Sequence, residues 1–94
     1  MSKYIKETKY CKVIKQAKLR DKNIAYGIEK IIVKELNQEE IRFVYFKDTV
    51  RMEEQLVPRP LDLTEKDLLE LIKLSIEHNV FSKNFINGLK EVIN

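Results

Sequence analysis

The sequence predicts an α+β fold in which a small antiparallel sheet is followed by two helices. Two observations lead to this prediction. The chain is rich in β-branched and aromatic residues from about residue 10 to about residue 57. Two later segments, at about 65–78 and 83–93, are amphipathic, and each follows a capping residue. Pro58 and Pro60 separate the halves, since proline cannot continue a strand ladder and biases its predecessor toward extended backbone. We expect three to four strands and a helical hairpin packed on one face of the sheet.

The strand segments differ in clarity. Ile41–Phe46 is apolar on both faces, which predicts a central strand, and it would pair with Ile28–Leu36 through a turn at residues 37–39. The stretch from Tyr10 to Leu19 fits a helical stripe and an extended segment equally well, and residues 24–36 share this ambiguity. We favour strands for both, with Leu56 and Val57 as a candidate short edge strand.

The helix starts are the most specific local signals in the chain. Thr64 is a cap residue with Asp67 three positions later, which resembles a capping box, and Leu63 and Leu68 stand at the two positions of a hydrophobic staple. Ser82 can cap the second helix in the same way. The short connection between the helices favours antiparallel neighbours, which is why we expect a hairpin.

The length of 94 residues predicts one domain, 1–94, with a modest core. Small domains often gain stability by dimerising or by docking on a partner, so association is favoured and a homodimer is one option. A single cysteine excludes an intramolecular disulfide, and the lysine-rich start contains no apolar signal segment. No stretch reaches the length of a spanning helix. We therefore expect a cytoplasmic protein without membrane association.

Few side chains are suited to catalysis. The only histidine, His78, falls near a helix end, where it is expected to favour the last carbonyls, and Cys11 among lysines is more readily a half-buried small residue than a nucleophile. One His and one Cys cannot form a structural zinc site, and two glycines cannot build a phosphate loop. We predict no enzymatic activity, no metal and no cofactor.

The N-terminal segment from Lys3 to Lys22 is strongly basic on a chain whose net charge is only +3. Tyrosines lie between its lysines, and this combination suits phosphates and stacked bases. Nucleic-acid binding is therefore the alternative function. Its candidate contacts, which would equally suit an acidic partner, are Lys12, Lys15, Lys18 and Arg20. The lysine and isoleucine content is also typical of an A/T-rich bacterial or phage genome, which alone could explain the lysines.

Binding of a protein partner is the preferred function, reached mainly by elimination. A small core and a sheet with at least one edge offer surface, and aromatic residues in strands are preferred interface anchors. The candidate interface aromatics are Tyr26, Phe43 and Tyr45. A compact inhibitor from a phage or mobile element that masks a host defence protein is a concrete member of this class.

Overall fold

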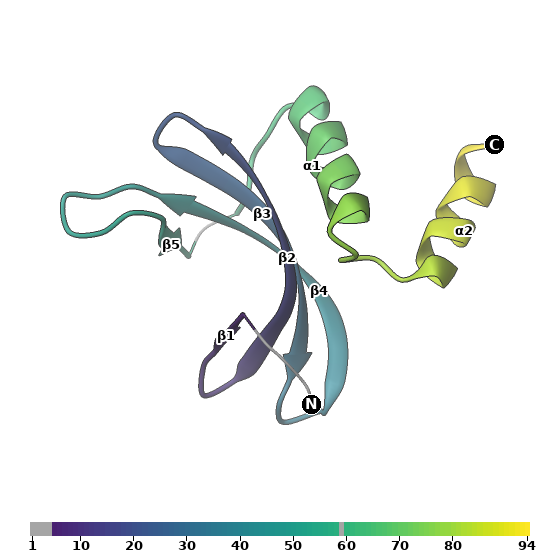
Figure 1. Ribbon diagram of the computed structural model, residues 1–94, viewed down its shortest axis with the longest axis horizontal. Coiled ribbons are helices and arrows are strands. Elements are labelled where there is room, and N and C mark those ends of the chain that lie inside the picture. The colour runs from purple at the N-terminus through teal and green to yellow at the C-terminus, as the bar shows by residue number, and fades with distance from the viewer. Residues whose placement is uncertain (1–4, 59) are drawn as a thin grey trace.

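The computed structural model describes residues 5–58 and 60–94 and shows a curled antiparallel sheet followed by two helices (Figure 1). The strands lie in the sheet in the order β1-β2-β3-β4-β5, so each strand neighbours the next along the chain. The elements are β1 (Lys6–Glu7), β2 (Cys11–Asp21), β3 (Ile24–Val33), β4 (Gln38–Lys47), β5 (Gln55–Val57), α1 (Glu65–Glu77) and α2 (Lys83–Ile93).

The predicted α+β class is confirmed, but the sheet has five strands rather than three to four. The ambiguous N-terminal segments are the strands β2 and β3, and the candidate edge strand is β5. The additional strand is β1, which pairs with only Lys12 and Val13 of β2. The turn between β3 and β4 covers residues 34–37 rather than 37–39, because Asn37 takes the left-handed conformation (φ 50°) that closes it.

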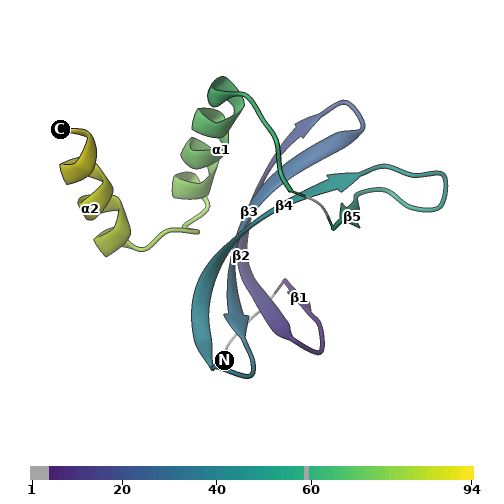
Figure 2. The same cartoon turned by 180° about the vertical axis from the view of Figure 1, so that it is seen from behind.

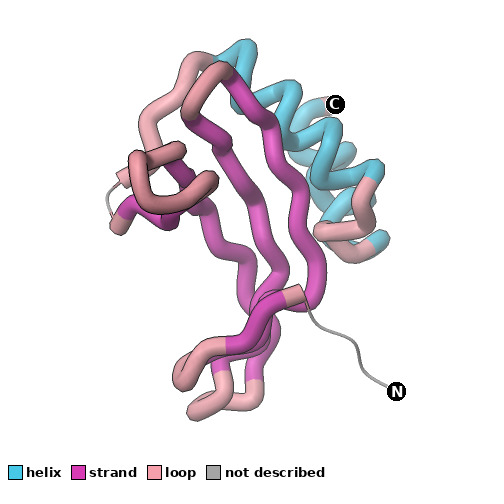
Figure 3. Tube along the Cα trace, turned by 60° about the vertical axis from the view of Figure 1, so that its left-hand side comes forward, coloured by secondary structure: helices cyan, strands magenta, loops and turns pink. Residues whose placement is uncertain are grey.

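The sheet bends so that its two faces differ (Figures 1 and 3). The helices lie outside the bend, where α1 covers part of the outer face, whereas β1 and β5 lie on the inside. The inner face is crowded at Gly27, where an added Cβ would lie 3.0 Å from Val44 Cγ2 and 3.5 Å from the Phe46 ring. The missing side chain lets β3 and β4 bend closely over each other at this point.

Helix α1 anchors the C-terminal half to β2 and β3 through a core of Ala17, Ile28, Leu71 and Val80. The Thr64 hydroxyl accepts from the Asp67 backbone N–H at 3.1 Å, as the capping pattern predicts. The helix ends in a Schellman motif, in which the Val80 N–H donates to the Ser75 carbonyl at 2.9 Å. This ending directs Val80, which is fully buried, back into the core.

Helix α2 corrects one expectation, because the two helices do not form a packed hairpin on the sheet. Ser82 caps α2 as predicted, its hydroxyl accepting from the Phe85 N–H at 3.1 Å. Nevertheless no Cα of α2 comes within 8 Å of a Cα in any other described helix or strand, and none of its residues is buried. Figures 1 and 2 show α2 standing apart from α1 and the sheet. The Schellman ending turns the chain outward after Val80 and leaves the apolar stripe of α2 uncovered.

Replacing Leu71 by alanine tests whether the α1 anchor stabilises the fold. Leu71 is fully buried against the sheet, so Leu71→Ala should lower the free energy of unfolding by about 3 kcal/mol. Leu69 lies on the same helix but is 62% exposed, and Leu69→Ala should change the free energy by less than about 0.5 kcal/mol. Urea unfolding followed by circular dichroism gives both values, and equal losses would contradict this packing.

Candidate protein-binding surface

The predicted interface aromatics lie together on the outer face of the sheet. Ile28 faces α1, and Phe43 stands directly opposite it on β4, while Tyr45 stands opposite Tyr26. Opposite residues of an antiparallel pair share a face, so all three aromatics point to the helix side. Tyr26 packs against the core cluster and Tyr45 is half-buried, but Phe43 is 52% exposed because α1 covers β2 and β3 and not β4. Of the three, Phe43 offers the most surface.

Strand β4 is central at one end only, which corrects the expectation for Ile41–Phe46. Strand β5 pairs with Tyr45, Phe46 and Lys47, and no other described strand pairs with β4 on that side. Residues 38–44 therefore form an open edge. On the side away from β3, their backbone donors and acceptors have no described strand with which to form hydrogen bonds. Ile41, 42% exposed, lies on this edge two residues from Phe43 and extends the same apolar strip.

The apolar stripe of α2 is the second part of the surface, although its sequence pattern predicts packing on the sheet. Its members recur at helical spacing: Phe85, Ile86, Leu89, Val92 and Ile93. Phe85 is 50% exposed, although its ring contacts Phe81 with centroids 4.8 Å apart. Phe81 and Phe85 also line a hollow of about 180 Å³ together with Ile41 of β4. The hollow connects the start of α2 with the open edge of β4.

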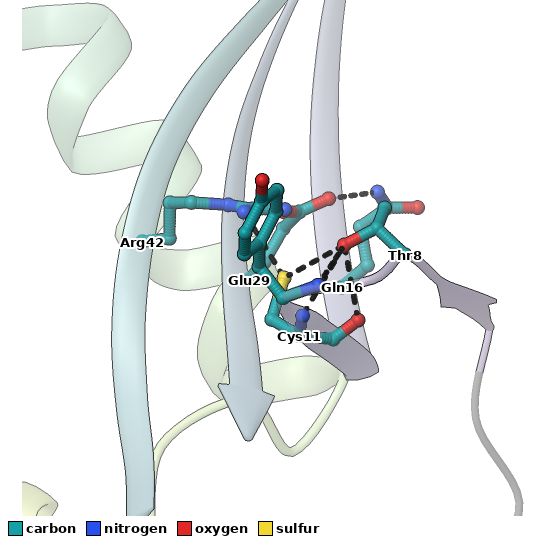
Figure 4. A network of polar contacts seen from close by, with 6 residues as sticks. Thr8, Cys11, Gln16, Glu29 and Arg42 are labelled. Atoms are coloured by element: carbon teal, nitrogen blue, oxygen red, sulfur yellow. Dashed lines mark hydrogen bonds and ion pairs between the residues drawn. The ribbon is translucent and has the colours of Figure 1, made fainter. Parts of the chain in front are cut away.

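The inner face of the sheet carries a buried polar network instead (Figure 4). Glu29 is 2% exposed and its Oε1 accepts from Arg42 Nε at 3.1 Å and Nη2 at 2.8 Å, while Oε2 accepts from Gln16 Nε2 at 2.5 Å. Burial alone would lower the pKa of Arg42, but the hydrogen bond and charge of Glu29 raise it above its ordinary value. Both oxygens of the carboxylate thus have hydrogen-bond partners, one of them a cation, which is typical of a structural group.

Cys11 belongs to this network and to the core, in agreement with the structural interpretation of its sequence position. Arg42 Nη1 donates to its sulfur at 3.4 Å, and the residue is 6% exposed. It packs with Val13 and Ile31. The side chain therefore contributes to packing between β2 and β3.

The four candidate basic contacts do not form one patch. Lys12 and Lys15 stand opposite Ile32 and Lys30 on the outer face, whereas Lys18 and Arg20 stand opposite Gly27 and Ala25 on the inner face. Ordinary alternation along β2 already places Lys15 and Lys18 on opposite faces, and the bulge between Val13 and Lys15 moves Lys12 to the face of Lys15. The start of the basic segment, Lys3 and Tyr4, lies outside the described residues, as does Arg59 between the two prolines.

Lys18 and Arg20 are engaged with carboxylates of the β4–β5 connection. Lys18 Nζ lies 2.5 Å from Glu54 Oε1, and Arg20 pairs with both Glu54 and Asp48. The hydrogen bond from Lys18 lowers the pKa of Glu54, and the charge of Arg20 adds to this effect. The backbone N–H of Glu54 lowers the pKa of Asp48, again with help from Arg20. These cations hold the connection against the inner face.

Residues 5–58 and 60–94 contain no group of three or more His, Cys, Asp or Glu side chains that could hold a metal ion. Within that same part of the chain, neither helix has the length and apolarity needed to cross a bilayer. In comparisons with known protein families, curated proteins and solved structures, nothing matches the chain. The surface of β4 and α2 is the candidate site that the exposed apolar residues described above indicate.

Removing Arg42 tests the inner-face network. Arg42→Met leaves the Glu29 carboxylate buried without its cation, so the free energy of unfolding should fall by roughly 2 to 3 kcal/mol, less than for a fully buried pair because the guanidinium reaches solvent. The double variant Arg42→Met with Glu29→Leu removes both charges and should recover most of this loss. Urea unfolding gives the free energy of unfolding of both variants. A double variant no more stable than Arg42→Met would contradict the pairing.

Acidification tests the ion pairs of the β4–β5 connection. Glu54 and Asp48 have lowered pKa values in the folded state, so their contribution to stability is present above about pH 4 and is lost as the pH falls through the folded values. Glu54→Gln should therefore show a smaller drop in unfolding midpoint than the wild type between about pH 5 and about pH 3. Glu53→Gln, at the exposed neighbouring position, should keep the wild-type drop. A drop of wild-type size in Glu54→Gln would argue against the assigned pairs.

Proposed function

We propose that this chain is a small non-enzymatic interaction protein that inserts the apolar stripe of α2 into an apolar groove of a partner protein. The observation that carries the proposal is the position of α2, an amphipathic helix with no Cα within 8 Å of a Cα in any other described helix or strand. Binding of an amphipathic helix in a groove is a common mode of protein recognition, with anchors at three-, four- and seven-residue spacing.

The composition of α2 supports a need for a partner. An isolated helix of fewer than about 12 residues is marginal in water, and α2 has 11. Asn84, Asn87 and Gly88 are weak helix formers, and the β-branched Val92 and Ile93 add little helix propensity. Val92 and Ile93 are also 79% and 75% exposed. Such a helix gains most of its stability from the surface that covers its apolar side.

The polar residues of α2 indicate the chemistry of the groove. Lys83 and Lys90 are seven residues apart and thus lie on the same side of the helix, next to the Ile86 border of the stripe. Only one acidic residue, Glu91, is present in α2. An apolar groove with acidic side chains on one rim would therefore complement α2 both in shape and in charge.

The nucleic-acid alternative has less support from the geometry. Its four contacts lie on two faces of the sheet, and Lys18 and Arg20 are already engaged by carboxylates. A protein partner that binds the stripe of α2 requires no ion pair of Lys18 or Arg20 to break. Masking a site on that partner is the form of action that suits a chain of this size.

Capture of the partner with matched variants tests the proposal. Tagged wild type and Leu89→Ser/Val92→Ser should be incubated with lysate before and after nuclease treatment, with Asn84→Ser/Asn87→Ser on the other side of α2 as the control. A protein retained by the wild type and the control, and lost with the stripe variant, is the expected result. The purified partner should then bind the stripe variant at least about tenfold more weakly.

Two outcomes would contradict the proposal. One is the same set of proteins on all three baits, and the other is nucleic acid as the only retained material before nuclease treatment. Circular dichroism of the three proteins checks that the serine variants keep the sheet.

A further inference from the structure

We infer that the open edge of β4 pairs with the same edge of a second copy, so that residues 38–44 of the two chains run antiparallel with Ile41 on the two-fold axis. The inference uses no residue of α2 and is therefore independent of the proposed function. It joins two five-stranded sheets into one continuous sheet of two copies.

The first argument is the state of the edge itself. Residues 38–44 have no described strand on the side away from β3, and natural proteins usually protect such an edge. Here the edge carries the exposed apolar side chains of Ile41 and Phe43, 42% and 52% accessible. A long edge with exposed apolar side chains is suited to strand addition.

The second argument is charge complementarity of the edge with itself. With Ile41 opposite Ile41 of the second copy, each Glu40 faces an Arg42, because these residues are one step to either side of the axis. Opposite charges at directly facing positions stabilise a strand pair. Glu40 is exposed, and the Arg42 side chain is 36% exposed, so the guanidinium is accessible while it holds Glu29.

The same charges exclude the neighbouring registers. Facing residues must share a face of the sheet, so the axis can move only to the position of another residue along the strand. An axis at Glu40 places two carboxylates opposite each other, and an axis at Arg42 places two guanidinium groups opposite each other. Like charges at facing positions destabilise the pair. The register centred on Ile41 is therefore the favoured one.

The ends of the edge leave room for the second strand. Pro58 follows β5 and has no N–H to extend the ladder, and a hollow of about 420 Å³ lined by Phe43, Val44, Val57 and Pro58 opens there. The opposite edge of the sheet differs, because the part of β2 beyond β1 carries Lys15, Lys18 and Arg20. Such cations discourage strand addition, so the β4 edge is the one that pairs.

The pairing also has a consequence for the outer face. A two-fold axis between antiparallel edge strands stands perpendicular to the sheet, so both copies present their outer faces on the same side. The two strips of Ile41 and Phe43 then adjoin, and the hollow at Phe85 of each copy borders them. A few strand residues bury less than the roughly 1,200 Å² of a stable interface, so the dimer should be weak and concentration-dependent.

Cysteine cross-linking tests the register. At the axis, the two Cα atoms of residue 41 would be about 4.5–5.5 Å apart, which is within disulfide range, whereas those of residue 43 would be about 14 Å apart. Ile41→Cys should therefore form a covalent dimer with oxidised glutathione as the oxidant, and Phe43→Cys should not. Wild type, whose Cys11 is buried, is the background control.

Sedimentation velocity from about 1 to about 200 µM tests the pairing without a cross-link. The wild type should shift from monomer to dimer over this range. Glu40→Arg, which places cations opposite each other, should weaken the dimer at least about tenfold, and Glu39→Arg, which has the same charge change but faces Phe43, should not.

Three results would overturn the inference: a monomeric wild type throughout the range, equal weakening by Glu39→Arg and Glu40→Arg, or equal cross-linking of Ile41→Cys and Phe43→Cys. Circular dichroism confirms that each variant is folded. Partner capture by α2 is measured separately, so failure of one proposal leaves the other testable.

Discussion

The contact of Leu71 and Val80 with Ala17 and Ile28 determines which surfaces of this molecule are covered. Leu71 of α1 and Val80 just after it are fully buried, and they hold α1 over β2 and β3. One helix is about 10 Å wide and covers roughly two strands, so the outer face of β4 is left exposed. The Schellman ending places Val80 in the core and turns α2 away. The exposed strip of β4 and the uncovered stripe of α2 therefore have the same structural origin.

The inner face of the sheet has polar contacts between two small apolar clusters. The Glu29 carboxylate is satisfied by Arg42 and Gln16, and the β4–β5 connection is held by Lys18 and Arg20. These contacts bring the connection over the inner face, so β5 is short and pairs only with the end of β4. The open edge is thus a consequence of how the polar inner face is stabilised.

Much of this fold could be predicted from local sequence signals, because caps and strand composition act over a few residues. Thr64 and Ser82 start the helices as expected, and the candidate edge strand at Leu56 and Val57 is present. Three features depend on non-local geometry and were missed. The bulge after Val13 moves Lys12 to the face of Lys15, residues 38–44 of β4 remain an open edge, and α2 does not return to the sheet. An apolar helix stripe has the same pattern whether its own core or a partner covers it.

Exposed apolar strips lower the stability of a small domain and favour unwanted association. A chain of 94 residues has little stability to spare, and an uncovered α2 contributes almost none. An exposed edge with Ile41 and Phe43 also favours unwanted strand addition unless its charges select one partner. Glu40 and Arg42 provide such selection, since only one register of the edge with itself pairs them. Either association that we propose, at β4 or at α2, would stabilise the folded chain by mass action and so link binding to stability.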